Sequence, residues 1–78
     1  MKNVAIYTTP VCVYCKKSKD FFEKNNIKYT EYDVLKDIAR RDEMIKRSGQ
    51  MGVPVIDIEG QLIVGYDERK FRQLLDIK

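Results

Sequence analysis

The sequence predicts a single α/β domain whose strands and helices follow the order βαβαββα. Three observations support this. The 78 residues suffice for one small domain and no more. Short β-branched runs alternate with amphipathic helical segments. Glu59-Gly60 separates two strand-like runs as a two-residue hairpin signal. Residues 1–78 contain no internal repeat, low-complexity tract or linker, so we expect one domain over this range.

A strand and a helix are predicted at the start of the chain. Val4–Thr8 is a continuous apolar, β-branched run, which is typical of a strand covered on both faces. Thr9 and Pro10 follow this run, and from Val13 to about Asn25 the pattern becomes helical. The helix face that we expect to be buried carries Cys15, Ser18 and Phe22.

The middle of the chain repeats the order of strand and helix. Ile27–Val34 is rich in β-branched and aromatic residues, which favour a second strand. Lys36–Arg47 is predicted to be the second helix, and Gly49 provides its stop signal. We expect one stripe of this helix to consist of Leu35, Ile38, Asp42 and Ile45.

Two strands and a helix complete the predicted domain. Val53–Ile58 and Gln61–Val64 flank the hairpin signal, and Asp67 to about Ile77 should form a helix. This last helix is expected to bury Phe71, Leu74 and Leu75. A right-handed crossover makes the strands of the opening βαβ unit parallel, and the hairpin adds an antiparallel pair.

Composition and charge argue against several classes of function. Fifteen Lys and Arg against twelve Asp and Glu leave a net charge of +3, which is small and mixed along the chain. No apolar run approaches the roughly 18 residues of a membrane span. The first residues hold too short an apolar stretch for a signal peptide. We therefore expect a cytoplasmic protein that binds neither nucleic acid nor membrane.

The cysteine count is the most informative part of the composition. Two cysteines and no histidine are too few for a disulfide-stapled secreted domain or for a closed zinc site. Nucleophilic schemes that need a histidine base are excluded as well. What remains is chemistry that a pair of thiols can carry out alone.

Cys12 and Cys15 lie where the first predicted strand passes into the first predicted helix. Unpaired N–H groups and the helix dipole favour an anion at a helix start, and cysteines in this setting become reactive thiolates. Cys15 lies one turn further along the same face, within reach of Cys12. We predict that Cys12 attacks and that Cys15 resolves. A metal half-site completed by a second subunit and two inert core cysteines are the alternatives.

Four blocks of this sequence resemble the glutaredoxin family, in particular its short bacterial members. The blocks are Tyr7–Cys15, Arg41–Gly49, Gly52–Pro54 and Gly65–Asp67, and together the resemblance covers nearly the whole chain. It implies a thioredoxin-like (glutaredoxin) fold with a four-stranded mixed sheet flanked by helices. It also implies a monomeric, metal-free enzyme that uses glutathione to reduce protein disulfides and glutathione mixed disulfides.

The resemblance implies substrate contacts close to the thiols. Val53 and Pro54 are expected to be joined by a cis peptide bond, which would turn the Val53 backbone outward beside Cys12 for pairing with an extended substrate. Tyr14, between the cysteines, is expected to form a wall of the substrate groove, and its alternative role is packing.

Three further positions are assigned to glutathione. Gln50 lies where the family places a polar or basic side chain against the glycine carboxylate, and loop solvation is the alternative. The N–H of Tyr66 or Asp67 suits the carboxylate of the γ-glutamyl group, and the Asp67 side chain suits its amine. Asp67 is also expected to cap the last helix, which is compatible with ligand binding.

Several positions depart from the family pattern. Thr9 stands where glutaredoxins commonly have a lysine, and Lys16 is a candidate to replace its charge. The missing lysine favours a second hypothesis, an electron-donor protein fed by a thioredoxin-type reductase, for example for ribonucleotide reductase. A third is a non-catalytic carrier that bridges an iron–sulfur cluster between two subunits.

Overall fold

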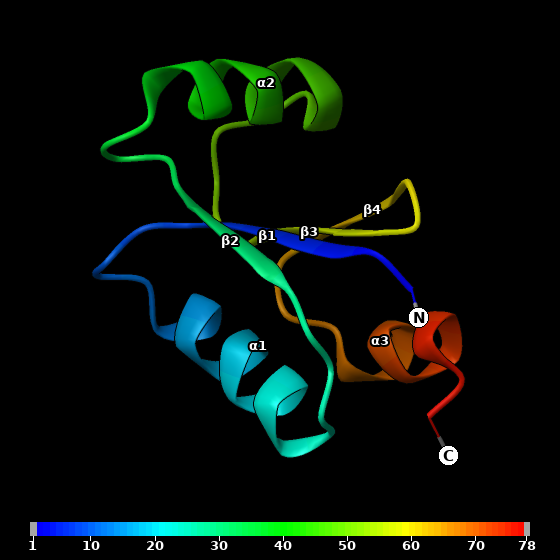
Figure 1. Ribbon diagram of the computed structural model, residues 1–78. Coiled ribbons are helices and arrows are strands. Elements are labelled where there is room, and N and C mark those ends of the chain that lie inside the picture. The colour runs from blue at the N-terminus through cyan, green and yellow to red at the C-terminus, as the bar shows by residue number, and fades with distance from the viewer. Residues whose placement is uncertain (1, 78) are drawn as a thin grey trace.

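The elements follow the predicted order in a computed structural model that describes residues 2–77. They are β1 (Val4–Thr8), α1 (Val13–Lys24), β2 (Thr30–Asp33), α2 (Ile38–Ser48), β3 (Val55–Ile58), β4 (Gln61–Val64) and α3 (Glu68–Leu75). Helix α2 covers one face of the sheet, and α1 and α3 lie on the other (Figure 1). The predicted α/β class and order of elements are confirmed.

The sheet is mixed and has the strand order β2-β1-β3-β4. Strand β1 pairs in parallel with β2 and antiparallel with β3, which pairs antiparallel with β4. The C-terminal ends of β1, β2 and β4 therefore lie at the same end of the sheet as the start of β3. This topology brings together the segments that follow β1 and β4 and the segment that precedes β3.

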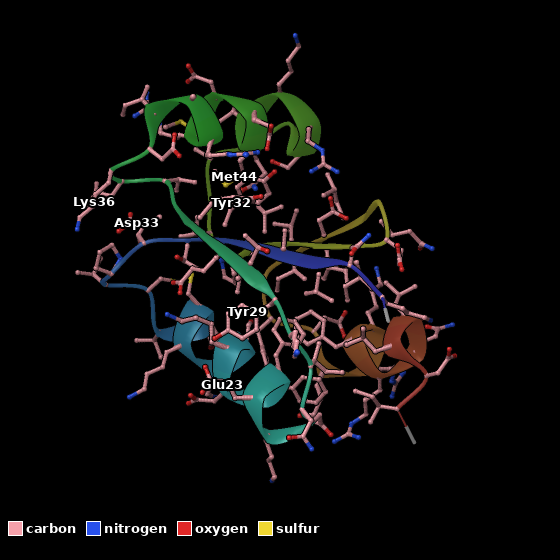
Figure 2. All side chains as sticks on the ribbon, in the orientation of Figure 1. Glu23, Tyr29, Tyr32, Asp33, Lys36 and Met44 are labelled. Atoms are coloured by element: carbon pink, nitrogen blue, oxygen red, sulfur yellow. The ribbon has the colours of Figure 1, made fainter. Side chains whose placement is uncertain are left out.

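Alternation along β1 divides the core between the two faces of the sheet. Ile6 packs into a cluster with Phe22 and Phe71 on the side of α1 and α3, whereas Tyr7 packs with Met44 on the side of α2. Figure 2 shows Met44 beneath α2, with Tyr29 on the opposite side of the sheet. The expectation that β1 is covered on both faces is confirmed.

The predicted stripe of the second helix is largely wrong. The chain turns before α2, because the Asp33 side chain accepts hydrogen bonds from the N–H groups of Leu35 and Lys36, at 3.0 and 3.3 Å. Leu35 therefore lies in this turn and is 64% exposed. Ile38 and Asp42 are also exposed, and the buried residue of α2 is Met44. Ile45 was correctly expected to pack against the core.

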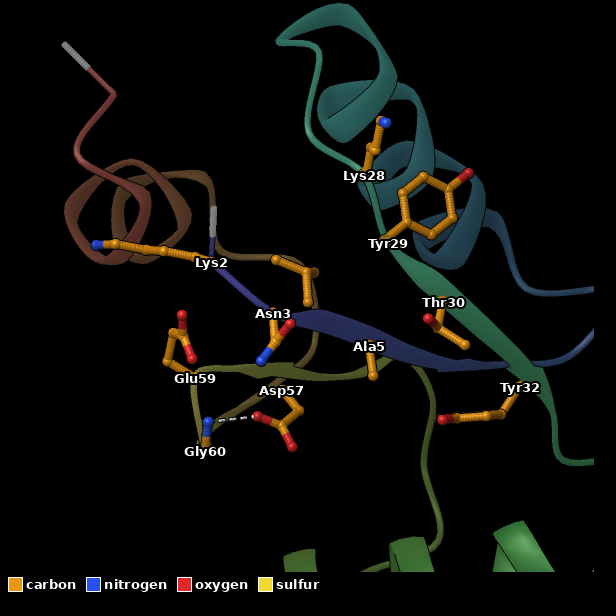
Figure 3. A pocket seen from close by; sticks show the side chains of 11 residues that line it. Lys2, Asn3, Ala5, Lys28, Tyr29, Thr30, Tyr32, Asp57, Glu59 and Gly60 are labelled. Carbon is orange, nitrogen blue, oxygen red and sulfur yellow. Dashed lines mark hydrogen bonds between the residues drawn. The ribbon is translucent and has the colours of Figure 1, made fainter.

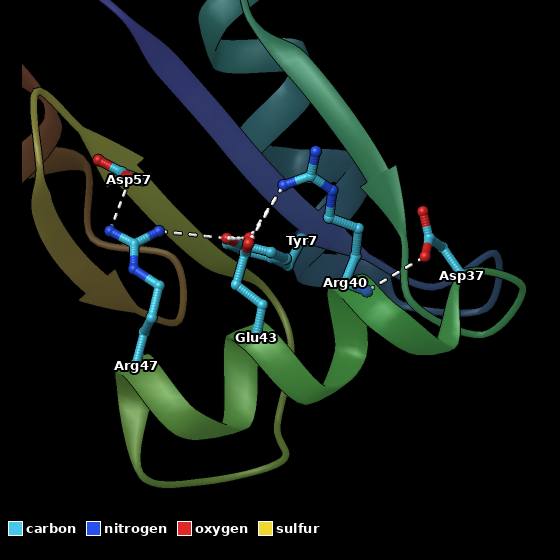
Figure 4. Close-up of polar contacts among 6 residues, drawn as sticks. All are labelled: Tyr7, Asp37, Arg40, Glu43, Arg47 and Asp57. Atoms are coloured by element: carbon cyan, nitrogen blue, oxygen red, sulfur yellow. Dashed lines mark hydrogen bonds and ion pairs between the residues drawn. The ribbon is translucent and has the colours of Figure 1, made fainter.

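A polar network holds α2 against the sheet (Figure 4). The buried Tyr7 hydroxyl donates to Glu43 at 2.5 Å and accepts from Arg47 at 3.1 Å. Arg47 also pairs with Asp57 of β3 at 2.8 Å, and Arg40 pairs with Glu43 at 3.1 Å. Burial raises the pKa of Tyr7, and the hydrogen bond from Tyr7 lowers that of Glu43. The spacing of apolar residues predicted the wrong buried face for α2, because this helix contacts the sheet partly through these polar side chains.

The bounds of β2 and β3 also differ from the sequence prediction. Strand β2 is shorter than Ile27–Val34, because its pairing with β1 runs only from Thr30 to Asp33. Strand β3 begins at Val55 rather than Val53, after a proline that has no N–H to donate. Helix α3 buries Phe71 as expected, and Leu74 and Leu75 pack at the edge of the same cluster.

Candidate active site

Three segments meet at the end of the sheet where β1 ends. The N–H of Gly65, which follows β4, donates to the carbonyl of Pro54, which precedes β3, at 2.8 Å. Cys12 lies in the third segment, with its Sγ 3.6 Å from the carbonyl oxygen of Val53. Cys12, Val53 and Pro54 are therefore neighbours although 41 positions separate Cys12 from Val53.

Cys12 is the N-cap residue of α1. Its backbone is extended, with φ −90° and ψ 114°, and its Sγ accepts a hydrogen bond from the N–H of Cys15 at 3.1 Å. The sulfur thus satisfies one of the N–H groups that a helix start leaves without an internal partner. A negatively charged sulfur gains most from this position, because the hydrogen bond and the helix dipole both favour an anion.

Cys15 lies beneath Cys12 and is 1% exposed. Burial raises the pKa of the Cys15 thiol to about 12, and its hydrogen bond with Cys12 acts in the same direction. The backbone at Thr9 and the charge of Lys19 lower it. Both cysteines are free thiols, and Cys12 is the more accessible one. At neutral pH the pair therefore combines an accessible sulfur with a buried, protonated one.

The peptide bond between Val53 and Pro54 is cis, as expected. Val53 is half-buried and Pro54 is buried, so Val53 is the member of this pair that remains partly accessible beside Cys12.

Tyr14 and Tyr66 lie on either side of a lysine that the sequence analysis did not single out. The Lys17 Nζ is 5.6 Å from the centre of the Tyr14 ring and 6.0 Å from that of Tyr66. Lys17 and Tyr66 also line a groove of about 340 Å³ between α1 and α3. The spacing of three residues between Tyr14 and Lys17 on a helix was the available signal. Lys17, not Lys16, carries the positive charge between these two rings.

Asp67 and Gln50 already have partners within the chain. The Asp67 carboxylate caps α3 by accepting from the N–H of Lys70 at 3.1 Å, which confirms the expected cap. The Gln50 amide folds back onto its own loop, donating to the carbonyl of Gly52 at 3.0 Å and accepting from its N–H at 2.6 Å. Contact of either side chain with glutathione stays a prediction.

A second hollow lies away from the thiols (Figure 3). Its volume is about 560 Å³, and its lining includes Lys2 and Ala5 at the start of β1 together with Thr30 and Asp57 of the adjacent strands. It lies toward the end of β1 opposite to Cys12, and none of the predicted site residues lines it.

Neither a metal centre nor a membrane span is found within residues 2–77. No group of three or more Cys, Asp or Glu side chains in this range could hold a metal ion. No helix in the same range is long and apolar enough to cross a membrane.

Comparison with known proteins places these features in a family. The glutaredoxin family model matches residues 4–63. The chain is 40% identical over 73 residues to a glutaredoxin-like 8.6 kDa protein of the rubredoxin operon of Clostridium pasteurianum, covering 94% of this chain and 97% of that protein. It is 41% identical over 68 residues to glutaredoxin 3 of Escherichia coli K12, covering 87% and 82%. A crystallised variant of the thioredoxin-like protein BC3987 superposes over 100% of both chains with a TM-score of 0.92 and 35% identity.

Proposed function

This chain belongs to the glutaredoxin family and carries a Cys12–Cys15 redox pair, and we propose that it is a glutathione-dependent thiol–disulfide oxidoreductase. The observation that carries the proposal is the unequal state of the two thiols. Cys12 caps α1 and accepts the Cys15 N–H at 3.1 Å, whereas burial keeps Cys15 protonated at neutral pH. One sulfur is suited to attack a substrate and the other to act second.

The reaction proceeds by two thiol–disulfide exchanges. The Cys12 thiolate attacks one sulfur of a protein disulfide or a glutathione mixed disulfide, and the other sulfur leaves as a thiolate that takes a proton from water. The mixed disulfide on Cys12 is then broken by the thiolate of glutathione or of Cys15. In the first case reduced Cys12 is regenerated directly. In the second, a Cys12–Cys15 disulfide forms, and two glutathione molecules reduce it while they are oxidised to their disulfide.

Glutathione is proposed to bind beside Cys12 with its two ends recognised separately. Lys17, between the rings of Tyr14 and Tyr66, offers a positive charge to a carboxylate. The start of α3 at Asp67 offers N–H groups and a carboxylate to the γ-glutamyl end. Lys17 would thus supply the positive charge that the family lysine provides at the position of Thr9. Gln50 remains a candidate contact for the glycine carboxylate of glutathione.

Protein disulfides are proposed as the second substrate class. Val11, 87% exposed, and Val13 flank Cys12, and Met51 near Val53 is 68% exposed. Exposed apolar side chains around a reactive sulfur favour contact with another protein over contact with a small charged thiol alone. Because both thiols come from one chain, a monomer suffices, and we propose that it acts in the cytoplasm.

The test compares Cys12→Ser with Cys15→Ser in an NADPH-coupled assay with glutathione and glutathione reductase. Cys12→Ser should abolish all turnover, because Cys12 forms the mixed disulfide. Cys15→Ser should keep reduction of a glutathionylated peptide, which glutathione itself resolves, and lose most reduction of a protein disulfide. Equal loss in both variants on the glutathionylated peptide would contradict the assigned roles. Activity with thioredoxin reductase and not with glutathione would instead favour the electron-donor hypothesis.

A further inference from the structure

Lys19 lies one helical turn after Cys15, on the same face of α1. Its side chain is 28% exposed, so it reaches from the buried side of the helix toward solvent. The charge of Lys19 acts on the Cys15 thiol and lowers its pKa, against the effect of burial. Lys19 is therefore placed to influence the thiol that must act second.

Two residues of the sheet hold Lys19 in this position. The Lys19 Nζ pairs with Glu31 Oε2 of β2 at 2.9 Å. The same oxygen accepts a hydrogen bond from the Thr8 hydroxyl at 2.8 Å, and Thr8 is buried at the end of β1. The hydrogen bond between Lys19 and Glu31 raises the pKa of Lys19 and lowers that of Glu31, so both stay charged at neutral pH.

We propose that Lys19, held by Glu31 and Thr8, is a positioning residue whose charge lets the buried Cys15 thiol ionise and resolve the mixed disulfide on Cys12. The inference rests on the proposed function, since it concerns the second exchange of that reaction. The glutaredoxin resemblance assigned no role to this lysine.

The electrostatics around Cys15 change when Cys12 becomes part of a mixed disulfide. In the reduced protein, burial, the hydrogen bond with Cys12 and the charge of Cys12 all raise the pKa of Cys15. Once the Cys12 sulfur is bonded to a substrate, its negative charge is lost and its hydrogen bond with Cys15 is weakened. Burial is then opposed by the backbone at Thr9 and, to a smaller extent, by the charge of Lys19. Two further charges act on the Lys19–Glu31 pair: Glu23 raises the pKa of Lys19, and Asp33 raises that of Glu31.

Cys15 resolves the mixed disulfide in a single thiol–disulfide exchange. Cys15 gives its proton to water or buffer, and the resulting thiolate attacks the Cys12 sulfur. A Cys12–Cys15 disulfide forms, the bond between Cys12 and the substrate breaks, and the substrate leaves as a thiolate. Lys19 keeps its proton throughout and acts only through its charge.

The test is a single-turnover reaction of the reduced protein with dithiobis-nitrobenzoate, a disulfide whose released thiolate absorbs visible light. Attack by Cys12 releases a first thiolate, and attack by Cys15 releases a second. We expect Lys19→Met to slow the second release about three- to tenfold at neutral pH and to move the midpoint of its pH profile upward, because one pKa unit changes the thiolate fraction tenfold. Lys19→Arg keeps the charge and should restore the wild-type profile.

Lys16→Met is the matched control. It removes the same charge next to Cys15 in the sequence, but one residue along a helix is about 100° away around its axis. Its second release should follow the wild-type profile. Unchanged kinetics in both Lys19→Met and Lys19→Gln, or equal slowing in Lys16→Met, would overturn the inference. Failure of the proposed function would look different, because the wild type would then show no turnover in the glutathione-coupled assay, whatever the rate of the second release.

Discussion

The buried Cys15 thiol should be nearly inert toward alkylation in the reduced protein. The reduced protein is treated with iodoacetamide at a series of pH values. Only the thiolate form of a cysteine reacts, and burial raises the pKa of Cys15 from 9.0 to about 12. Cys12 is the more accessible thiol, so the Cys15 rate is taken from the earliest times, before alkylation of Cys12 removes the hydrogen bond and the charge that also raise the pKa of Cys15.

These two pKa values set how slowly Cys15 should react with iodoacetamide. At neutral pH the change lowers the thiolate fraction of Cys15 about a thousandfold, since one pKa unit is a factor of ten. A more basic thiolate is also a better nucleophile. With a Brønsted slope of about 0.4–0.5, the Cys15 thiolate should react roughly twentyfold faster than an ordinary thiolate, which offsets part of this loss. Cys15 should therefore react about 50-fold more slowly than an ordinary thiol, before hindrance by burial is counted.

Peptide mass mapping after timed alkylation measures the extent of modification at Cys15. Modification of Cys15 should accelerate about tenfold per pH unit and should not level off near pH 9, where an ordinary thiol does. Free glutathione provides the ordinary thiol for comparison. If Cys15 were modified at neutral pH within threefold of the glutathione rate, the reasoning from burial would be refuted.

The same shift has a consequence for stability. Above pH 9.0 the unfolded chain loses the Cys15 proton while the folded chain keeps it, so the unfolded state is favoured as the pH rises toward about 12. The free energy of unfolding should fall by about 1.4 kcal/mol per pH unit from this group. Cys15→Ser should remove this contribution, so its stability, measured by urea unfolding, should fall less steeply above pH 9.

Two other predictions address α2 and the glutathione site. Tyr7→Phe removes a buried hydroxyl that has two charged hydrogen-bond partners, so it should lower the free energy of unfolding by about 1–3 kcal/mol in urea. Tyr14→Phe, at an exposed position, should change it by less than about 0.5 kcal/mol, and equal effects would contradict the network. Lys17→Met should raise the KM for glutathione about two- to fivefold at low salt, the range of an exposed ion pair. Lys16→Met should leave this KM unchanged, and the reverse order would assign the carboxylate to Lys16.

Much of the fold could be predicted because its signals are local. The apolar run of Val4–Thr8, the hairpin signal at Glu59-Gly60 and the glycine stop at Gly49 each depend on neighbouring residues, and the structure has them as expected. The face of α2 could not be predicted this way. Its buried side depends on Met44 and on polar contacts with Tyr7, which lies more than 30 positions away.

The candidate site likewise combines features with local sequence signals and contacts between distant residues. Local sequence signals were enough to place Cys12 at a helix start and Cys15 one turn later, because helix capping and helical period are properties of a few consecutive residues. The family resemblance added the expectation that Val53 lies beside Cys12, and the structure bears it out. That Lys17 lies between two tyrosines and that Glu31 holds Lys19 became visible only in the folded molecule. Such contacts join separate elements. They depend on strand order, register and the packing of helices on the sheet, which no short stretch of sequence specifies.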